Sequence, residues 1–144
     1  MERDHNIELL NKIYEGAEMG RDILGRLIPL CYDGSLRCSM AEQFAEYHRI
    51  LVESERLLLN AGHIAKPASR AARAPIYASL RLNLKIDGTS SHLAEMLMQG
   101  NLMGYIDIAR GLSAYTGAKE ETRHLAERLM AMEDNNMKQM RRFL

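Results

Sequence analysis

Apolar residues recur every three or four positions through four long segments of this 144-residue chain. That spacing is the period of an α-helix with one buried face, and strong helix formers such as Leu, Met, Ala, Glu and Arg fill the positions between. Only three prolines interrupt the chain. We therefore predict an all-α domain with long helices over residues 6–31, 36–61, 91–115 and 119–143.

Capping and turn residues mark the ends of these segments. Asn6 can cap the first helix and Ser35 the second, because short polar side chains accept hydrogen bonds from the free N–H groups of a first turn. Gly62 suits the left-handed position that ends many helices. Short turns join the first two helices and the last two, so each pair should form an antiparallel hairpin.

A connection of 28 residues, Gly62 to Thr89, separates the two hairpins. Its LRLNLKI segment alternates like a strand, but a lone strand in a helical chain would have no partner. We instead expect a short helix over residues 74–86 that begins at Pro75, since proline suits a first turn. One long connection between two hairpins predicts a four-helix bundle of ferritin-like topology rather than a short-looped bundle.

Charge and composition set limits on location and partners. Nineteen basic and nineteen acidic side chains leave no net charge, which gives no support for a nucleic-acid or membrane-surface protein. The first residues lack the apolar core of a signal peptide, and no run approaches a membrane span, so we expect a cytoplasmic protein. Cys31 and Cys38 flank a predicted turn at a spacing that matches no metal or redox motif. We expect reduced thiols, although a disulfide across the turn stays open.

Motifs in the four long segments resemble those of the ferritin-like superfamily, and of rubrerythrin-type di-iron domains in particular. The motifs are YEGAEMGRD, AEYH, MQGNLMGY and MEDNN. Over nearly its whole length the chain also resembles a family of small Firmicutes proteins that begin with NIELLN and end with an E-x-N-N motif, a likeness that implies no activity. The di-iron resemblance implies metal ligands at Glu18, His48 and Glu133.

The same resemblance implies an incomplete metal site. Ala45 and Asn101 stand where the family has glutamates, and Asn136 stands where it has a histidine. Two carboxylates would leave most of the charge of a di-iron centre uncompensated in a bundle core. We therefore expect a non-enzymatic binding or interaction module without a cofactor. The alternative is a protein that binds Fe or Mn, or an oxidoreductase, with an atypical carboxylate and histidine site.

Glu133 falls on the inward face of the last predicted helix, between Met130 and Met137. A buried carboxyl group needs hydrogen-bond partners or a raised pKa. We interpret Glu133 as part of a polar core layer that fixes helix register, with a remnant metal or ligand site as the alternative. Candidate partners on or near inward faces are Tyr47, Gln99, Asn101 and Asn136, together with Gln43.

Three glycines, Gly100, Gly104 and Gly111, share one stripe of the third long helix. Each should cost roughly 1 kcal/mol relative to alanine in a helix interior, so a close neighbour is the expected compensation. The small pair Ala17 and Gly20 of the first helix is the predicted partner for this stripe.

The long connection is basic, with no acidic residue from Arg56 to Ile86. It can bind an anion or a nucleic acid through Arg70, Arg73 and Arg81, or it can pair with the acid-rich remainder of the chain. The chain is rich in methionines, which fill gaps in cores and can line a flat interface. We expect a homodimer.

Overall fold

The computed structural model describes residues 4–144, and within that range its regular elements are helices, with no strand. The α-helices are α1 (His5–Leu27), α2 (Gly34–Asn60), α3 (Arg70–Ile86), α4 (Ser90–Ala114) and α5 (Glu120–Met140). Short 3₁₀ turns, Ile28–Leu30 and Arg141–Phe143, follow α1 and α5. The predicted all-α class is confirmed.

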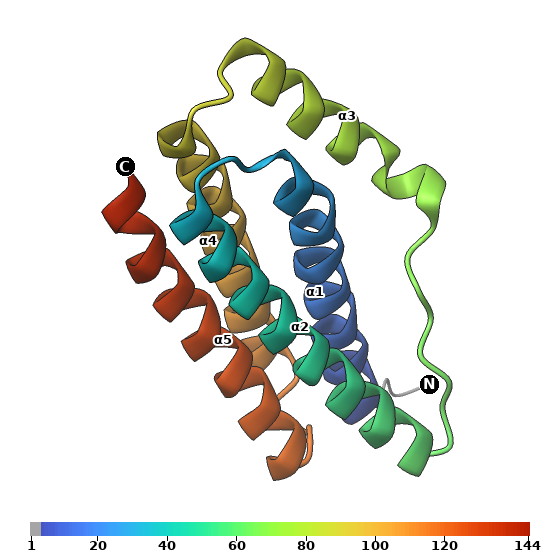
Figure 1. Cartoon of the computed structure of the whole chain (residues 1–144). Coiled ribbons are helices and arrows are strands. Elements are labelled where there is room, and N and C mark those ends of the chain that lie inside the picture. The colour runs from blue at the N-terminus through green and yellow to red at the C-terminus, as the bar shows by residue number, and fades with distance from the viewer. Residues whose placement is uncertain (1–3) are drawn as a thin grey trace.

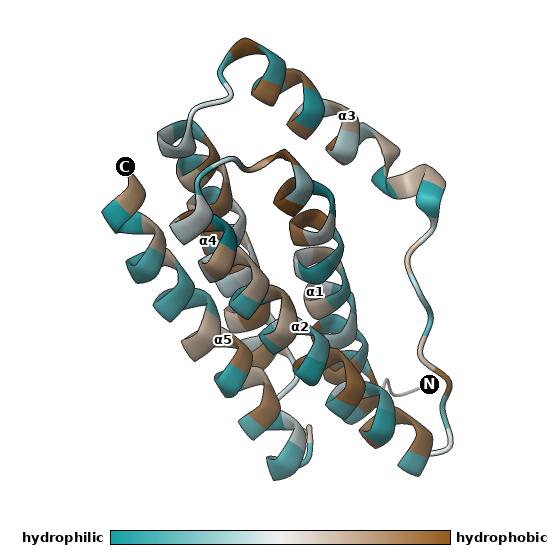
Figure 2. Ribbon diagram, in the orientation of Figure 1, coloured by the Kyte–Doolittle hydropathy of each residue, from teal (hydrophilic) through white to brown (hydrophobic). Residues whose placement is uncertain are grey.

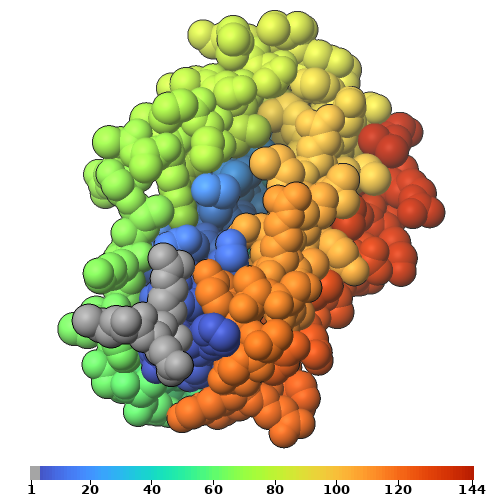
Figure 3. Space-filling view, turned by 180° about the vertical axis from the view of Figure 1, so that it is seen from behind, coloured from blue at the N-terminus to red at the C-terminus, as the bar shows by residue number. Residues whose placement is uncertain are grey.

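Four long helices lie side by side, and α3 lies outside them (Figure 1). Helices α1 and α2 form one antiparallel hairpin, and α4 and α5 form the other. The segment after α2 runs back along the bundle, and α3 then crosses to the start of α4. Helix α1 packs against α2 and α4, and α5 packs against α4 and α2, and these four pairs are antiparallel. Helices α1 and α5 also contact each other across the bundle and run in the same direction. Seen from behind, α1 lies between the connection and α4 (Figure 3).

The core is built from the inward faces of the four long helices. Along each of these helices apolar and polar residues alternate, as Figure 2 shows. Helix α3 contributes a single buried residue, Arg73, and otherwise lies on the surface. None of the helices in residues 4–144 combines the length and hydropathy that crossing a bilayer requires. The largest fully buried apolar side chains are Leu9, Leu10, Ile13, Leu24, Leu36, Met40, Ile50, Leu58, Ile108, Leu129 and Met140.

The capping residues differ from the predicted ones at two helices. Asp4 caps α1 by accepting hydrogen bonds from the first-turn N–H groups, whereas Asn6 lies inside the helix and its Oδ1 accepts from the Lys119 amide at 3.2 Å. Asp33, rather than Ser35, caps α2. Asp4 and Asp33 each lie directly before the first helical residue with an extended backbone, the conformation from which a short side chain accepts hydrogen bonds from the first-turn amides.

Prolines explain two further differences from the predicted boundaries. Helix α1 ends at Leu27 instead of residue 31, because Pro29 has no N–H for the next helical hydrogen bond. Helix α3 begins at Arg70, so Pro75 lies inside it rather than in its first turn. The carbonyl that Pro75 leaves without a donor belongs to exposed Ala71 and can bond to water. The predicted left-handed Gly62 is confirmed, with φ of 81°.

Removing the Asp33 cap should destabilise the fold. Asp33 Oδ1 accepts from the Leu36 amide at 2.9 Å, so Asp33→Ala should lower the free energy of unfolding by about 1 kcal/mol. Ser35→Ala, two residues away and exposed, is the matched control and should change it little. Urea unfolding of both variants measures this; equal effects would contradict the assignment of Asp33 as the cap.

Candidate functional site

A buried carboxyl group joins three helices in the middle of the bundle. Glu133 of α5 is 3% exposed, and its Oε1 accepts a hydrogen bond of 2.7 Å from the Tyr47 hydroxyl of α2. Its Oε2 accepts one of 3.0 Å from the Asn101 amide of α4. The same amide nitrogen lies 3.1 Å from the Tyr47 hydroxyl oxygen. These contacts close a small network, which we call the Glu133 layer.

Two glycines make room for this layer. A Cβ atom built on Gly104 of α4 would lie 3.1 Å from the Glu133 carboxyl carbon, and one built on Gly20 of α1 would lie 2.5 Å from the Tyr47 ring. Both distances are shorter than ordinary van der Waals contact. The close approach expected for the glycine stripe therefore occurs at Gly104, but its partner is Glu133 of α5 rather than Ala17 and Gly20 of α1.

The other two glycines of the stripe have different surroundings. Gly111 packs against the side chains of Lys12 and Leu9 in α1, whereas a Cβ atom on Gly100 would meet nothing within 4 Å. The stripe is therefore not one continuous contact surface.

Burial raises the pKa of Glu133 to about 7, and the hydrogen bonds from Tyr47 and Asn101 lower it only in part. Burial, followed by the nearby Glu133 charge, raises the pKa of the Tyr47 phenol well above 10, so Tyr47 remains a donor at neutral pH. Glu133 thus gains and loses its proton near neutrality. The buried Asn101 Oδ1 has no partner among residues 4–144. If the Asn101 amide flips by 180°, this oxygen can accept a hydrogen bond from the protonated Glu133 carboxyl group.

The layer has further hydrogen-bonding capacity beyond these contacts. Asn136 lies one turn after Glu133 and is 1% exposed, and neither of its amide atoms has a partner in residues 4–144. The Gln43 Nε2 atom of α2 is also buried without a hydrogen-bond partner in residues 4–144. Buried polar groups usually have partners, so these amides keep hydrogen-bonding capacity that the described contacts do not use.

The structure places four of the five predicted polar core residues in the interior: Tyr47, Asn101, Asn136 and Gln43. Gln99 is the exception, because it lies exposed on the outer face of α4. Two residues of helix turn the chain by about 200°, so Gln99 and the buried Asn101 must face opposite ways.

The three predicted metal ligands do not meet at one place. Glu133 lies in the core layer, whereas Glu18 is bound to Arg73 of α3. His48 is exposed, with its Nδ1 3.3 Å from an Arg21 guanidinium nitrogen. Within residues 4–144, no three His, Cys, Asp or Glu side chains are grouped as metal ligands would be. The metal ligands that the di-iron resemblance implies, Glu18, His48 and Glu133, therefore do not form one site in this structure.

A buried ion pair attaches α3 to the bundle. The Arg73 guanidinium lies 3.0 Å from Glu18 Oε1 and 3.2 Å from Asp22 Oδ2, both of α1. The Arg73 and Glu18 side chains are 6% and 7% exposed, and the Ala68 amide also donates to Glu18 at 3.0 Å. Of the basic residues of the connection, Arg73 thus pairs with acids of the remainder of the chain, as one of the two predicted alternatives expects.

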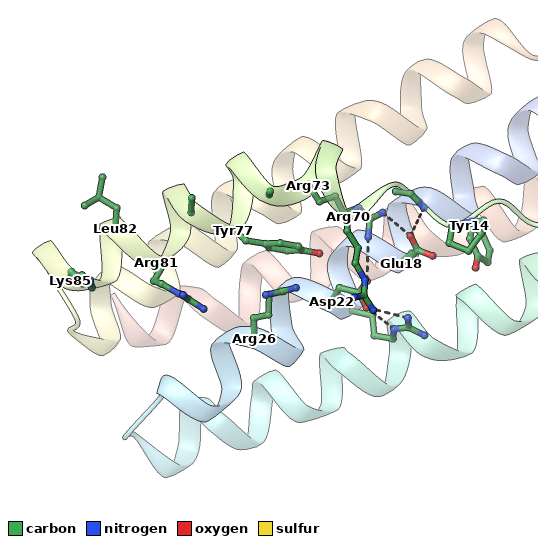
Figure 4. Close-up of a pocket in the computed structure, with 15 residues that line it drawn as sticks. Tyr14, Glu18, Asp22, Arg26, Arg70, Arg73, Tyr77, Arg81, Leu82 and Lys85 are labelled. Atoms are coloured by element: carbon green, nitrogen blue, oxygen red, sulfur yellow. Dashed lines mark hydrogen bonds and ion pairs between the residues drawn. The ribbon is translucent and has the colours of Figure 1, made fainter.

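A cleft of about 1,020 Å³ lies between α1 and α3 beside this ion pair (Figure 4). Its lining includes six basic side chains and two acidic ones. Arg26 stacks on the Tyr77 ring at 3.7 Å from the ring centre, which joins the two walls. We call this the α1–α3 cleft; its basic residues are Arg21, Arg26, Arg70, Arg73, Arg81 and Lys85.

Four of these cations have no carboxylate within 4 Å in the described part of the chain: Arg26, Arg70, Arg81 and Lys85. Two of the three predicted anion-binding residues, Arg70 and Arg81, therefore have free guanidinium groups at the cleft. The third, Arg73, has its charge balanced by Glu18 and Asp22 and holds the wall in position. Arg26 and Lys85 were not predicted, because only the fold places Arg26 of α1 opposite α3.

Comparison with known proteins gave no match: no family model, no protein of curated function and no solved structure is significantly similar to this chain.

Gly104 and Gly100, two glycines of the same helix, offer a matched test of close packing at Gly104. Gly104→Ala forces the Glu133 carboxyl away from Tyr47 and Asn101, so we expect the free energy of unfolding to fall. Gly100→Ala adds a methyl group in open space and should raise it by up to about 1 kcal/mol through helix propensity. Chemical unfolding measures both; stabilisation by both substitutions would contradict tight packing at Gly104.

Ionisation of Glu133 should weaken the fold as pH rises. Its folded pKa of about 7 exceeds the ordinary 4.5, so the folded state binds the proton more tightly than the unfolded chain does. This contribution, up to about 3 kcal/mol, is complete below pH 4.5 and is lost as pH rises through 7. Glu133→Gln cannot ionise, so its unfolding free energy should fall less than that of the unmodified chain between about pH 5 and 8.

The matched control is Glu127→Gln, an exposed glutamate of the same helix, which should keep the unmodified pH profile. Urea unfolding at several pH values measures all three proteins. Parallel profiles for the Glu133 variant and the unmodified chain would show that Glu133 does not titrate in this range.

Proposed function

We propose that this chain is a non-catalytic helical-bundle protein that binds a small phosphate-bearing anion in the α1–α3 cleft. The observation that carries the proposal is the convergence of Arg26, Arg70, Arg81 and Lys85 on one cleft without carboxylate partners in residues 4–144. Like charges that gather without counter-charges repel one another, and an anion relieves that repulsion. Guanidinium groups also match the geometry of phosphate oxygens.

The shape of the site favours a small ligand over a nucleic acid. The cationic side chains line a cleft bounded by the single helix α3, which is about 25 Å long at 1.5 Å per residue. Arg73, Glu18 and Asp22 hold that wall without a ligand, so the cleft is preformed. An aromatic surface is available at Tyr77, but Arg26 already covers one face of the ring.

We also propose that the bundle is ferritin-like in topology. Support comes from four antiparallel pairs, α1–α2, α4–α5, α1–α4 and α2–α5, and from the long connection that returns along the bundle between α2 and α4. In this proposal the positions of the central metal ligands are occupied by the Glu133 layer. Neutral Asn101 and Tyr47 there stabilise one carboxyl group by hydrogen bonds in place of metal ions. The cytoplasmic location and the homodimer remain predictions.

Inorganic pyrophosphate, titrated by calorimetry at low salt, tests the proposed anion site. The unmodified chain should bind it, and the double variant Arg70→Gln, Arg81→Gln should bind at least about tenfold more weakly, since charge-assisted hydrogen bonds contribute about 1.5–3 kcal/mol each. Raising the salt concentration should also weaken binding.

Arg128→Gln is the matched control, because this exposed arginine lies on α5 away from the cleft. Its affinity should equal that of the unmodified chain. Absence of pyrophosphate binding, or equal losses in the cleft and control variants, would overturn the anion site.

A further inference from the structure

The outer face of α4 is apolar although it is exposed. Residues 96–106 contain no charged side chain. On the outer face of this stretch, Leu102, Met103 and Ile106 are 48%, 72% and 39% exposed. A surface helix of a monomer normally carries polar and charged residues there. The apolar face therefore has the composition of an interface rather than of a solvated surface.

These residues form one continuous stripe. At 100° per residue, Gln99, Leu102, Met103 and Ile106 fall within about 100° of one another on the helix. The buried residues of α4, among them Leu97 and Ile108, lie on the opposite side. Other exposed apolar residues of the bundle helices, such as Val52 and Leu59 of α2, do not belong to a comparable charge-free stretch.

Opposite charges stand at the two ends of the stripe. Glu95 and Arg110 lie on the same outer face, fifteen residues or about 22 Å apart, with the midpoint between Leu102 and Met103. No carboxylate of residues 4–144 lies within 4 Å of Arg110, and the Glu95 carboxylate lies 3.7 Å from the His92 ring of its own helix. Asp107, which interrupts the pattern, is turned toward α1 and bound to Lys12 at 2.8 Å.

We propose that α4 pairs antiparallel with α4 of a second copy of this chain, about a two-fold axis between Leu102 and Met103. In a two-fold interface each contact occurs twice, so the patch must complement itself. An antiparallel pair places Leu102 opposite Met103 of the second copy and Glu95 opposite its Arg110. Both ion pairs form at once, on either side of an apolar centre.

Other arrangements fit the same residues less well. A parallel pairing would set Glu95 against Glu95 and Arg110 against Arg110, which is repulsive at both ends. A shallow hollow of about 470 Å³ lies beside Ile106 and Arg110, bordered by Tyr105 and Ser113. In the antiparallel register this hollow faces Gln99 and Glu95 of the second copy. Their long polar side chains can enter it.

Sedimentation equilibrium of the full chain tests the pairing. The unmodified chain should be a dimer at micromolar concentration, and Met103→Glu should weaken the dimer at least about tenfold because it buries two charges at the axis. Glu127→Arg, an exposed charge reversal on α5, is the control and should leave the dimer intact. Circular dichroism checks that each variant keeps its helical content.

Charge reversal tests the register itself. Glu95→Arg and Arg110→Glu should each weaken the dimer, since each opposes like charges at both ends. The double variant should restore it, and so should an equimolar mixture of the two single variants, because a mixed pair has opposite charges at both ends. A monomeric unmodified chain, a dimer insensitive to Met103→Glu, or reversal variants without rescue would each overturn the proposal.

Discussion

The bundle depends on a single constraint, that a carboxyl group cannot remain in an apolar core without partners. Glu133 satisfies it with a phenol from α2 and an amide from α4, which fixes the relative heights of three helices at one layer. The layer also restricts residues that take no part in the hydrogen bonds. Gly104 must be small because the carboxyl group lies against it, and Gly20 must be small because the Tyr47 ring does. One buried carboxyl group thus sets sequence requirements in all four long helices.

The same constraint acts at the surface of the bundle and shapes the cleft. Glu18 is nearly as buried as Glu133, but its partner is a full positive charge, Arg73, supplied by the long connection. A buried ion pair of this kind contributes little net stability, because desolvation offsets its attraction. Its effect is on position: α3 packs few apolar side chains, so the Arg73 contacts with Glu18 and Asp22 decide where α3 lies. Once α3 is held there, its remaining cations face Arg26 across the cleft.

The features that depend on local sequence were predictable, and those that depend on contacts between distant residues were not. Apolar spacing predicts the four long helices, and the inward position of Glu133 predicts a polar layer with Tyr47 and Asn101. The prediction that Gln99 faces inward is wrong, because side chains two residues apart on a helix point in nearly opposite directions and Asn101 is the buried one. Glu18 was assigned inward from a motif, whereas its actual partner lies 55 positions along the chain, at Arg73. Nothing in local spacing indicates which of the five basic residues in the connection would reach it.

The outer face of α4 and the α1–α3 cleft are separate surfaces of the bundle. The inner face of α4 meets Glu133 at Gly104 and α1 at Gly111, so that side packs within the bundle. An apolar outer face then has no role within one copy, and the cost of exposing it is recovered only when a partner removes it from water, at about 25 cal/mol per Å². No residue of α4 lines the α1–α3 cleft. Pairing through α4 would therefore leave the cleft open, so that each copy in a dimer could bind an anion without competing with the interface.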